Sequence, residues 1–377
     1  MTLLILSTGA LCVVFALIHC ASIIVTVARV RNAVAAAPSA EDSAGVSIIR
    51  PVCGIENYSA ETLGSAFFLT HPRYELLFCV ASAADPIIPL IRRLIAAHPH
   101  VSARLLIGND RISPNPKLNN IVKGLAAARH DWIVMADSNV LMPPDYIHSL
   151  LAAWRPDTGL VCSPPIGCVP DGLWAELECA FLNTYQARWQ CVADALGIGF
   201  AQGKTMLWRR DILAAGGGIQ ALAAEVAEDA ASTKLIRGLG LRVRLVASPF
   251  GQPLGRRSAG DVWRRQVRWA RLRRDTFKVF FLPELLAGGL APCLCAATCA
   301  AAAGLPVAGV LGAFAAAWYG AELLLARAAG WHRSPRSPLV CMLRDLLLPA
   351  LWLASWLGND FVWRGTAMRV ADRGSSA

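Results

Sequence analysis

The chain of 377 residues is poor in charge, because only 16% of its residues are Asp, Glu, Lys or Arg while 55% are hydrophobic. Its mean hydropathy of +0.46 is too high for an ordinary soluble domain. Its middle part is nevertheless too polar for a simple bundle of membrane helices. The composition therefore excludes a wholly soluble protein and favours a polar domain held by membrane segments.

Paired cysteine motifs are also absent. The twelve cysteines include no Cys-x-x-Cys pair, and several lie in apolar runs. They are therefore interpreted as small hydrophobic residues of a reduced protein, not as a disulfide framework. The net charge of +10 comes with no RNA- or DNA-binding signature, which argues against a nucleic-acid partner. Attraction to anionic lipid headgroups explains the excess of arginine better.

The first apolar run, residues 3–27, contains no charge and is long enough to cross about 30 Å of hydrocarbon. Arg29 and Arg31 follow it, so the positive-inside rule places the next segment in the cytoplasm. A cleaved signal peptide is the alternative, because residues 33–40 resemble a cleavage site. No Lys or Arg precedes Arg29, however, and a signal peptide begins with a basic region.

The distal part of the chain repeats this pattern. Residues 285–305 and 307–326 are predicted to form two spans, followed by a basic loop. Residues 346–357 are apolar but only about a dozen long, and Pro349 interrupts them. We expect an interfacial or re-entrant segment there, with a longer span reaching Val362 as the alternative. The predicted parts are an anchor (1–31), a cytoplasmic domain (46–250), a basic interfacial helix (251–281) and C-terminal membrane segments (282–365).

The polar middle of the chain alternates between strands and helices. Strands are predicted at residues 46–52, 74–81, 103–108 and 131–137, and helices at 86–97 and 118–129. This alternation predicts βαβ units and an α/β fold with a covered, mostly parallel sheet. Residues 35–44 are interpreted as a short tether. Asp85 and Asp137 each follow a strand, at the edge where such sheets bind ligands.

A basic and aromatic pentad, Arg265-Gln266-Val267-Arg268-Trp269, precedes the apolar tail. Its two arginines are three residues apart and therefore lie on one face of a helix. Two guanidinium groups on one face can bind one diphosphate. The alternative is that this arginine-rich neighbourhood is only an interfacial helix facing anionic headgroups.

Five motifs in one order resemble those of the ceramide glucosyltransferase-type GT-A glycosyltransferases, in glycosyltransferase families 21 and 2. They are Asp85, Asn-Pro-Lys-Leu-Asn-Asn at residues 115–120, Asp137-Ser138, Ala-Glu-Asp at residues 227–229, and the pentad. The match covers residues 47–276. The resemblance implies a Rossmann-like GT-A domain with membrane helices, a nucleotide sugar as donor and a membrane lipid as acceptor.

The resemblance also implies which residues bind the donor. Asp137 is expected to hold a divalent cation, Mg²⁺ or Mn²⁺, against the diphosphate of UDP-glucose. Asp85 resembles the residue that contacts the uridine end, and Lys117 and Asn119 resemble further donor-site residues. Each has a plainer alternative. Asp137 and Asp85 can cap a turn or helix start, and Lys117 can be a solvated loop lysine.

Asp229 is the expected general base that takes the proton from the acceptor hydroxyl in an inverting transfer. Its neighbour Glu228 is a competitor, and both can instead be acids at a helix start. Arg265 and Arg268 are expected to bind the diphosphate, and Trp269 to wall the acceptor-sugar pocket.

Many relatives carry Asp-x-Asp where this chain has Asp137-Ser138-Asn139, but the ceramide-type branch is similar in having only the first Asp. One departure from that branch is Gln186, where eukaryotic ceramide enzymes have a histidine. Gly203, in Gln-Gly-Lys-Thr at residues 202–205, is expected to permit a close backbone approach. The expected activity is transfer of glucose from UDP-glucose to ceramide. The alternatives are a diacylglycerol or hopanoid acceptor, a polysaccharide synthase, and a membrane scaffold with an inactive domain.

Overall fold

The computed structural model describes residues 1–32, 44–363 and 366–370. The chain forms two compact units that are interleaved in sequence. Unit 1 consists of residues 1–31, 169–192 and 256–358, and unit 2 of residues 32–168, 193–255 and 359–377. The tether predicted over residues 35–44 lies, except for Ala44, outside the described residues.

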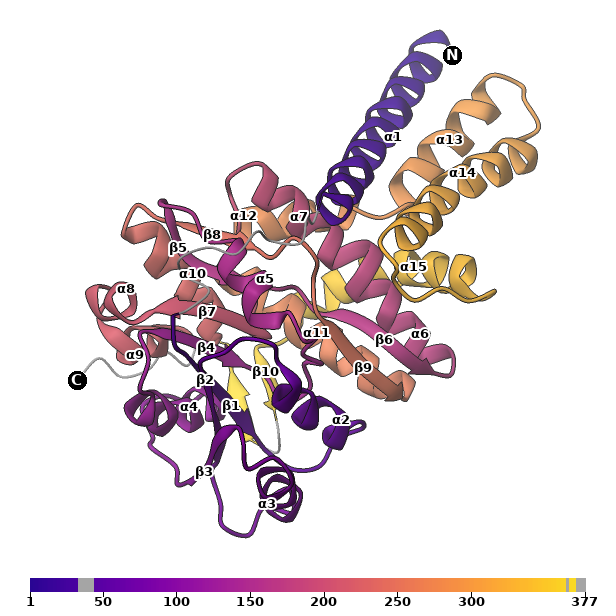
Figure 1. The fold of residues 1–377 in the computed structure, drawn as a ribbon. Helices are drawn as coiled ribbons and strands as arrows, with labels where there is room; N and C mark the ends of the chain where they lie inside the picture. Colours follow the sequence, from indigo (N-terminus) through magenta and orange to yellow (C-terminus); the bar gives the residue numbers. More distant parts are fainter. Residues whose placement is uncertain (33–43, 364–365, 371–377) are drawn as a thin grey trace. The chain divides into compact units, whose positions relative to one another are not determined.

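Unit 2 contains a seven-stranded mixed sheet in the order β3-β2-β1-β4-β7-β5-β8 (Figure 1). The first four strands are parallel, and β7 runs antiparallel to both β4 and β5. The strands are β1 (Val46–Val52), β2 (Tyr74–Val80), β3 (Ser102–Ile107), β4 (Trp132–Ala136), β5 (Thr158–Cys162), β7 (Thr205–Arg209) and β8 (Arg242–Leu245). The four strands expected from the sequence are confirmed within one residue at each end.

Helices and short strands surround this sheet. The helices are α2 (Ser59–Gly64), η2 (Ser65–Phe68), α3 (Ile88–Ala97), α4 (Pro116–Ala127), α5 (Tyr146–Ala152), α8 (Arg210–Ala215), α9 (Gly218–Ala221), η4 (Leu222–Ala224) and α10 (Glu228–Gly238). Two further strand pairs are β6 (Ile166–Asp171) with β9 (Gly251–Arg256), and β10 (Asp360–Trp363) with β11 (Thr366–Arg369). Residues of β1 and β4 are almost wholly buried, because helices cover the parallel sheet.

The order of the parallel strands fixes where a ligand can bind. The chain passes from β1 to β2 and β3 on one side, then returns to place β4 on the other side of β1. Ligands in open α/β sheets bind beyond the carboxyl ends of the strands at such a reversal. Asp137 is the first residue after β4 and therefore lies at this position.

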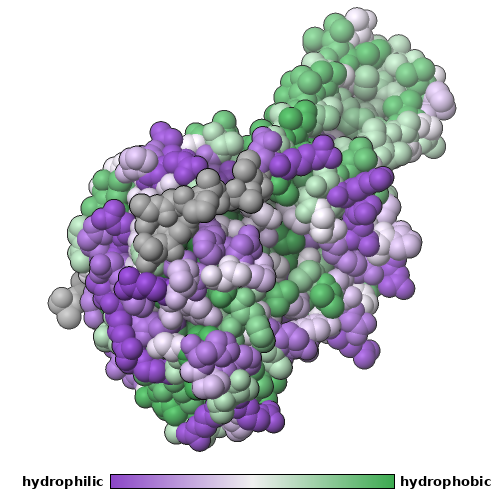
Figure 2. All heavy atoms as spheres, viewed as in Figure 1, coloured by the Kyte–Doolittle hydropathy of each residue, from purple (hydrophilic) through white to green (hydrophobic). Residues whose placement is uncertain are grey.

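Unit 1 is helical. It contains α1 (Thr2–Arg31), α6 (Leu173–Ala180), the π-helix η3 (Phe181–Ala187), α7 (Arg188–Ala195), α11 (Ala259–Thr276), α12 (Lys278–Phe281), η5 (Leu282–Leu286), α13 (Leu290–Ala302), α14 (Val307–Ala328) and α15 (Ser337–Trp356). Helices α1, α13 and α14 lie side by side (Figure 1). Figure 2 shows hydrophobic residues gathered over these three helices.

Several of these helices suit a membrane. Among the described residues, α1, α14 and α15 are long and apolar enough to span one. The segment from α12 to α13 would be a fourth span if its two halves, Lys278–Leu286 and Leu290–Ala302, are counted together. These halves are bent by 41° relative to each other, so the span predicted over residues 285–305 corresponds to a bent helix pair, which is either a broken span or a re-entrant loop.

The last apolar segment also differs from expectation. Helix α15 has 20 residues and begins at Ser337, so the prediction of a segment about a dozen residues long was wrong. Arg344 and Asp345 interrupt the apolar pattern just before residue 346, and charged side chains are unfavourable inside a membrane. Both side chains are buried and neutralised by partners inside unit 1, so the helix continues through them.

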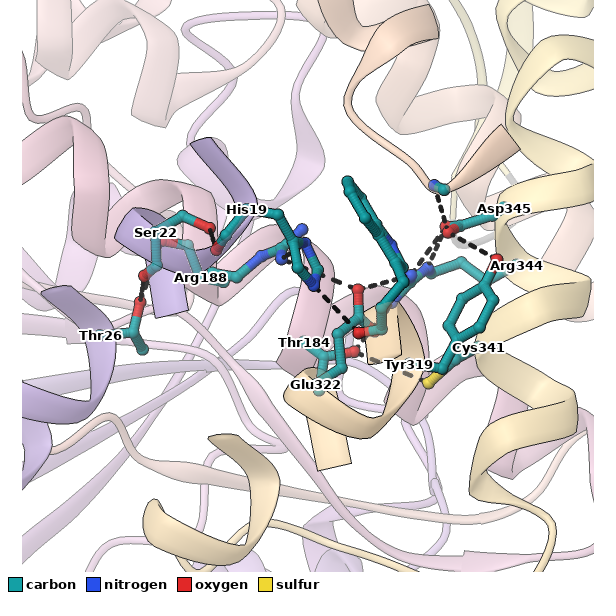
Figure 3. A network of polar contacts seen from close by, with 12 residues as sticks. His19, Ser22, Thr26, Thr184, Arg188, Tyr319, Glu322, Cys341, Arg344 and Asp345 are labelled. Carbon is teal, nitrogen blue, oxygen red and sulfur yellow. Dashed lines mark hydrogen bonds and ion pairs between the residues drawn. The ribbon is translucent and has the colours of Figure 1, made fainter. Parts of the chain in front are cut away.

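These partners form a polar network among the apolar helices (Figure 3). Arg344 forms an ion pair with Glu322 at 2.9 Å and donates a hydrogen bond to the Thr184 hydroxyl at 2.8 Å. Arg188 lies 3.8 Å from Glu322 and donates to Nδ1 of His19 at 2.7 Å. Because arginine can only donate, Nε2 of His19 carries the proton and donates to a backbone carbonyl at 3.0 Å. The network therefore joins α1, α14 and α15 to η3 and α7.

Candidate functional site

The motif at residues 115–120 begins helix α4 and places its lysine. The side chain of Asn115 caps the helix by accepting hydrogen bonds from the backbone of Lys117 at 2.9 Å and Leu118 at 3.2 Å. Pro116 occupies the first turn, where a missing N–H costs nothing. The Asn115 amide also donates to Glu228 at 2.7 Å, which links this helix start to the start of α10.

Lys117 joins two of the predicted acidic sites. Its Nζ lies 2.7 Å from Oδ1 of Asp137 and 2.6 Å from Oε1 of Glu228, and it also donates to the carbonyl of Gly203. Burial lowers the pKa of the ammonium group, but Asp137 and Glu228 outweigh this and raise it. Lys117 is therefore held in its charged form between two carboxylates and is not a solvated loop lysine.

Asp137 has a second lysine on its other oxygen. Nζ of Lys204 lies 2.9 Å from Oδ2 of Asp137 and 3.0 Å from Oδ1 of Asn139. Burial raises the pKa of Asp137, but the two lysines hold it well below its ordinary value. Arg50, a fully buried residue of β1, holds the loop after β4 in place. Its guanidinium donates to the carbonyls of Asp137 and Val140 at 2.9 and 3.0 Å.

Asp229 lies in the first turn of α10, close to the same lysine. Its Oδ2 accepts a hydrogen bond from Gly203 N at 3.1 Å, and its Oδ1 accepts one from Ala230 N at 2.8 Å. Burial and the adjacent negative charge of Glu228 raise the pKa of Asp229 to about 6. A carboxylate with this pKa can take a proton near neutral pH, as a general base must.

Gly203 makes this crowding possible. A Cβ atom at this position would lie 2.6 Å from Oε1 of Glu228 and 3.1 Å from Nζ of Lys117. The predicted close backbone approach is therefore present, and it is made to these charged side chains.

The residues at Asp137 fit a divalent cation that arrives together with phosphate. Mg²⁺ is commonly held by one or two carboxylates and completes its shell with phosphate oxygens and water. Asp137 supplies one carboxylate, and binding would require Lys204 or Lys117 to release an oxygen. No group of three or more His, Cys, Asp or Glu that could hold a metal ion occurs in the part of the chain that the structure describes.

The other two predicted donor-site residues make local contacts. Both oxygens of Asp85 accept from Gly54 N, at 3.1 and 3.0 Å, and Oδ1 also accepts from Ile87 N at 3.0 Å. The side chain of Asn119 is buried and exchanges hydrogen bonds of 2.9 Å with the backbone of Ser113 and Ile112. Each of these side chains therefore organises a loop beyond a strand end, and their contacts with a donor stay a prediction.

The pentad lies in unit 1, on helix α11, and its helical form agrees with the predicted spacing. Arg265 forms an ion pair with Glu178, a buried residue of α6 that also pairs with Arg257 at 3.2 Å. Arg268 and Trp269 are partly buried on the same helix. The pentad is thus more than a solvated headgroup-facing surface, because one of its arginines is anchored to a buried carboxylate.

Gln186, singled out in the sequence analysis, also contacts the pentad. Its amide donates to the side chain of Gln266 at 3.1 Å. Both glutamines line a small pocket in unit 1 whose interior, about 20 Å³, holds little more than one water molecule. The other lining residues are Phe181, Tyr185, Ala270, Arg273, Phe281, Glu284, Leu348, Leu351 and Trp352.

Three residues of these sites were not found from the sequence. Arg50 could have been noticed as an arginine inside an otherwise apolar strand. Glu178 lies in an apolar stretch and could have been noticed in the same way. Lys204 gave no signal, because its approach to Asp137 depends on β7 lying next to β4.

A comparison with protein families supports the same interpretation. The model of glycosyl transferase family 21 matches residues 11–376. The chain belongs to glycosyltransferase family 21. The motifs at 115–120, 137–138, 227–229 and 265–269 all lie inside the matched range.

Similar proteins include ceramide glucosyltransferases. Ceramide glucosyltransferase 1 of Caenorhabditis elegans is 28% identical over 244 residues, covering 64% of this chain and 51% of that protein. Ceramide glucosyltransferase 3 of the same organism is 25% identical over 345 residues, covering 88% and 74%. The ceramide glucosyltransferase of Komagataella phaffii is 43% identical over 100 residues, 26% of this chain and 20% of that protein. This family 21 chain thus spans about half of the first of these relatives.

A solved structure shows the fold. The mannosyltransferase PcManGT from Pyrobaculum calidifontis, determined with GDP-Man and Mn²⁺, superimposes with a TM-score of 0.50 at 18% identity. The superposition covers 90% of this chain and 99% of that one. The predicted α/β fold of the GT-A type, with helices apolar enough to span a membrane, is confirmed.

Proposed function

We propose that this family 21 protein transfers glucose from UDP-glucose to the hydroxyl group of a membrane lipid, ceramide in the first instance, with inversion at the anomeric carbon. The observation that carries the proposal is the cluster of Asp137, Lys117, Glu228 and Asp229 at the carboxyl ends of the strands. The names of the similar ceramide glucosyltransferases support the choice of sugar and acceptor.

In this proposal Asp229 removes the proton from the acceptor hydroxyl. The hydroxyl oxygen then bonds to the anomeric carbon while the bond from that carbon to the diphosphate oxygen breaks, and the nucleoside diphosphate leaves with the electron pair. The pKa of Asp229, raised to about 6, supports this role, because the group is ionised yet basic near neutral pH.

The donor diphosphate is proposed to bind beside Asp137. Asp137 would hold a divalent cation, Mg²⁺ or Mn²⁺, which when bound neutralises charge on the leaving diphosphate. Lys117 supplies a further positive charge whose position is fixed by Glu228. Asp85 and Asn119 are proposed to contact the nucleoside side of the donor through the loops that they organise.

The pentad, in unit 1, is proposed to bind phosphate. Arg265 and Arg268 lie on one face of α11 and can present guanidinium groups to a phosphate. Glu178 orients Arg265, and Trp269 would contact the sugar or the acceptor. For the orientation, Arg29 and Arg31 in the last turn of α1 support a cytoplasmic catalytic domain under the positive-inside rule.

The test is direct. Membranes containing the protein are incubated with UDP-glucose, Mg²⁺ or Mn²⁺, and either ceramide or diacylglycerol, and the lipids are measured by mass spectrometry. A single hexosylceramide supports the proposal. Hexoses on diacylglycerol would keep the mechanism and replace the acceptor. No transfer from UDP-glucose to these lipids or to a hopanoid would overturn the assignment of donor and acceptor.

A further inference from the structure

Lys204 is the feature of the site that the proposed function leaves unexplained. Its backbone is fixed, because its carbonyl accepts a hydrogen bond from Asp137 N at 3.0 Å just before β7 begins. Its ammonium group contacts Oδ2 of Asp137 and donates to the side-chain oxygen of Asn139. The two lysines therefore contact different oxygens of one carboxylate.

The two lysines differ in their carboxylate partners and in their exposure. Lys117 is shared by Asp137 and Glu228, and its side chain is 9% exposed. Lys204 pairs with Asp137, and its side chain is 16% exposed beside a carboxylate that is 20% exposed. Lys204 is thus the more exposed of the two lysines at Asp137.

The charge of the cluster shows what Lys204 adds. Four carboxylates (Asp137, Glu228, Asp229 and Glu56, which accepts from Asn139) and three cations (Lys117, Lys204 and Arg50, which donates to the Asp137 carbonyl) leave one net negative charge when all are ionised. Without Lys204 the net charge would be minus two. A diphosphate, itself an anion, would then meet a strongly repulsive site unless a metal ion came with it.

The residue type also matters. Only five of the 36 basic residues in the chain are lysines, and two of these five meet at Asp137. Lysine carries a compact, strongly hydrated point charge on a flexible stem, whereas arginine carries a broad planar one. An ammonium group is therefore the side chain that most nearly matches a small metal ion in size and charge density.

We infer that Lys204 is a built-in cation of the donor site. It supplies positive charge to the donor's diphosphate from its position at Oδ2 of Asp137, so that a nucleoside diphosphate binds without a divalent metal. This inference rests on the proposed function, because it takes Asp137 as the diphosphate end of the donor site. Added metal ion competes with the Lys204 ammonium for Oδ2 of Asp137 and is an aid to binding, not a condition for it.

The test measures binding, not turnover. The full-length protein in detergent is titrated with UDP by calorimetry, once in EDTA and once in Mn²⁺, and compared with Lys204→Met. Lys234→Met is the matched control. Lys234 lies in α10, is 46% exposed and pairs with Glu225. Thermal unfolding of each variant shows whether it is folded.

The wild type and Lys234→Met are expected to bind UDP in both solutions. In EDTA, Lys204→Met should bind UDP at least about tenfold more weakly than the wild type, which corresponds to the loss of one charge-assisted hydrogen bond. In Mn²⁺ the loss of UDP affinity should be much smaller. Binding of UDP by the wild type only in Mn²⁺ would overturn the inference, as would an equal loss by Lys204→Met in both solutions. Absence of UDP binding by the folded wild type in either solution would overturn the proposed donor, and the inference with it.

Discussion

Arg344 and Glu322 form a two-point ion pair between α15 and α14, with Nη1–Oε2 and Nη2–Oε1 distances of 2.9 and 3.0 Å. Neither side chain is exposed. A paired arrangement of this kind is costly to break, because the remaining charge is left buried without a partner. Thr184 ties the same pair to η3, the helix that carries Gln186, and Arg188 ties it to α7.

Arg344→Met is therefore expected to destabilise the protein by roughly 3–5 kcal/mol, because Glu322 would lose its main counter-charge. Thermal unfolding in detergent measures the change. The control is Arg264→Met, which removes an arginine that is 73% exposed and should cost less than about 1 kcal/mol. If Arg344→Met matched this control, the network would have no part in stability. Adding Glu322→Gln to Arg344→Met should recover part of the loss, since both charges are then gone.

The rate of transfer is expected to fall as the pH is lowered through about 6, because Asp229 then gains a proton and no longer accepts one from the acceptor. The ratio kcat/KM, measured from pH 5 to pH 8, gives this acidic limb. Asp229→Asn should reduce transfer by about 10²–10⁴-fold at every pH and leave UDP binding nearly unchanged. Retention of substantial activity by Asp229→Asn would refute the base assignment.

Glu228→Gln tests the origin of that acidic limb. The negative charge of Glu228 raises the pKa of Asp229, so its removal should move the limb to lower pH. The neutral amide keeps a similar shape and still accepts from Asn115. The pH profile of this variant is compared with the wild type in the same buffer series. A limb that stayed in place would show that Glu228 does not set the pKa of Asp229, and abolished transfer at all pH values would favour Glu228 as the base.

Gly203→Ala is expected to impair catalysis more than folding. The new methyl group would displace the side chains of Glu228 and Lys117, which are fixed by each other and by Asn115. We expect transfer to fall at least about tenfold, with destabilisation within the roughly 1–3 kcal/mol typical of overpacking. Gly238→Ala, in α10 with no atom within 4 Å of the added Cβ, is the control and should retain activity. Equal activities of the two variants would contradict the close packing at Gly203.

Much of unit 2 could be predicted from the sequence, because its signals are local. The β-branched run at β1 and the apolar run at β4 predicted their strands. Helix α4 was predicted two residues late at each end, because the cap at Asn115 was not recognised. Asp137 could be placed at the ligand edge because the carboxyl ends of parallel strands share one edge. The roles of these residues in transfer remain predictions.

Features that depend on distant pairing could not be predicted. Lys204 reaches Asp137 only because β7 enters the sheet antiparallel to β4. The start of α15 at Ser337 was missed because a hydropathy window counts Arg344 and Asp345 as isolated charges. Their neutralisation by Glu322 and by the backbone of Gly289 is a property of the packed helices.

The polar network also sets an order of events during synthesis. His19 in α1 donates to the carbonyl of Trp318, which follows it by 299 residues, and the intervening chain includes all of the seven-stranded sheet. The first apolar helix thus leaves the ribosome long before its native hydrogen-bond acceptor exists. Unit 1 reaches its native set of contacts only after α14 and α15 have been made. The apolar helices therefore include the first segment of the chain to be synthesised, and they are among the last to complete their native contacts.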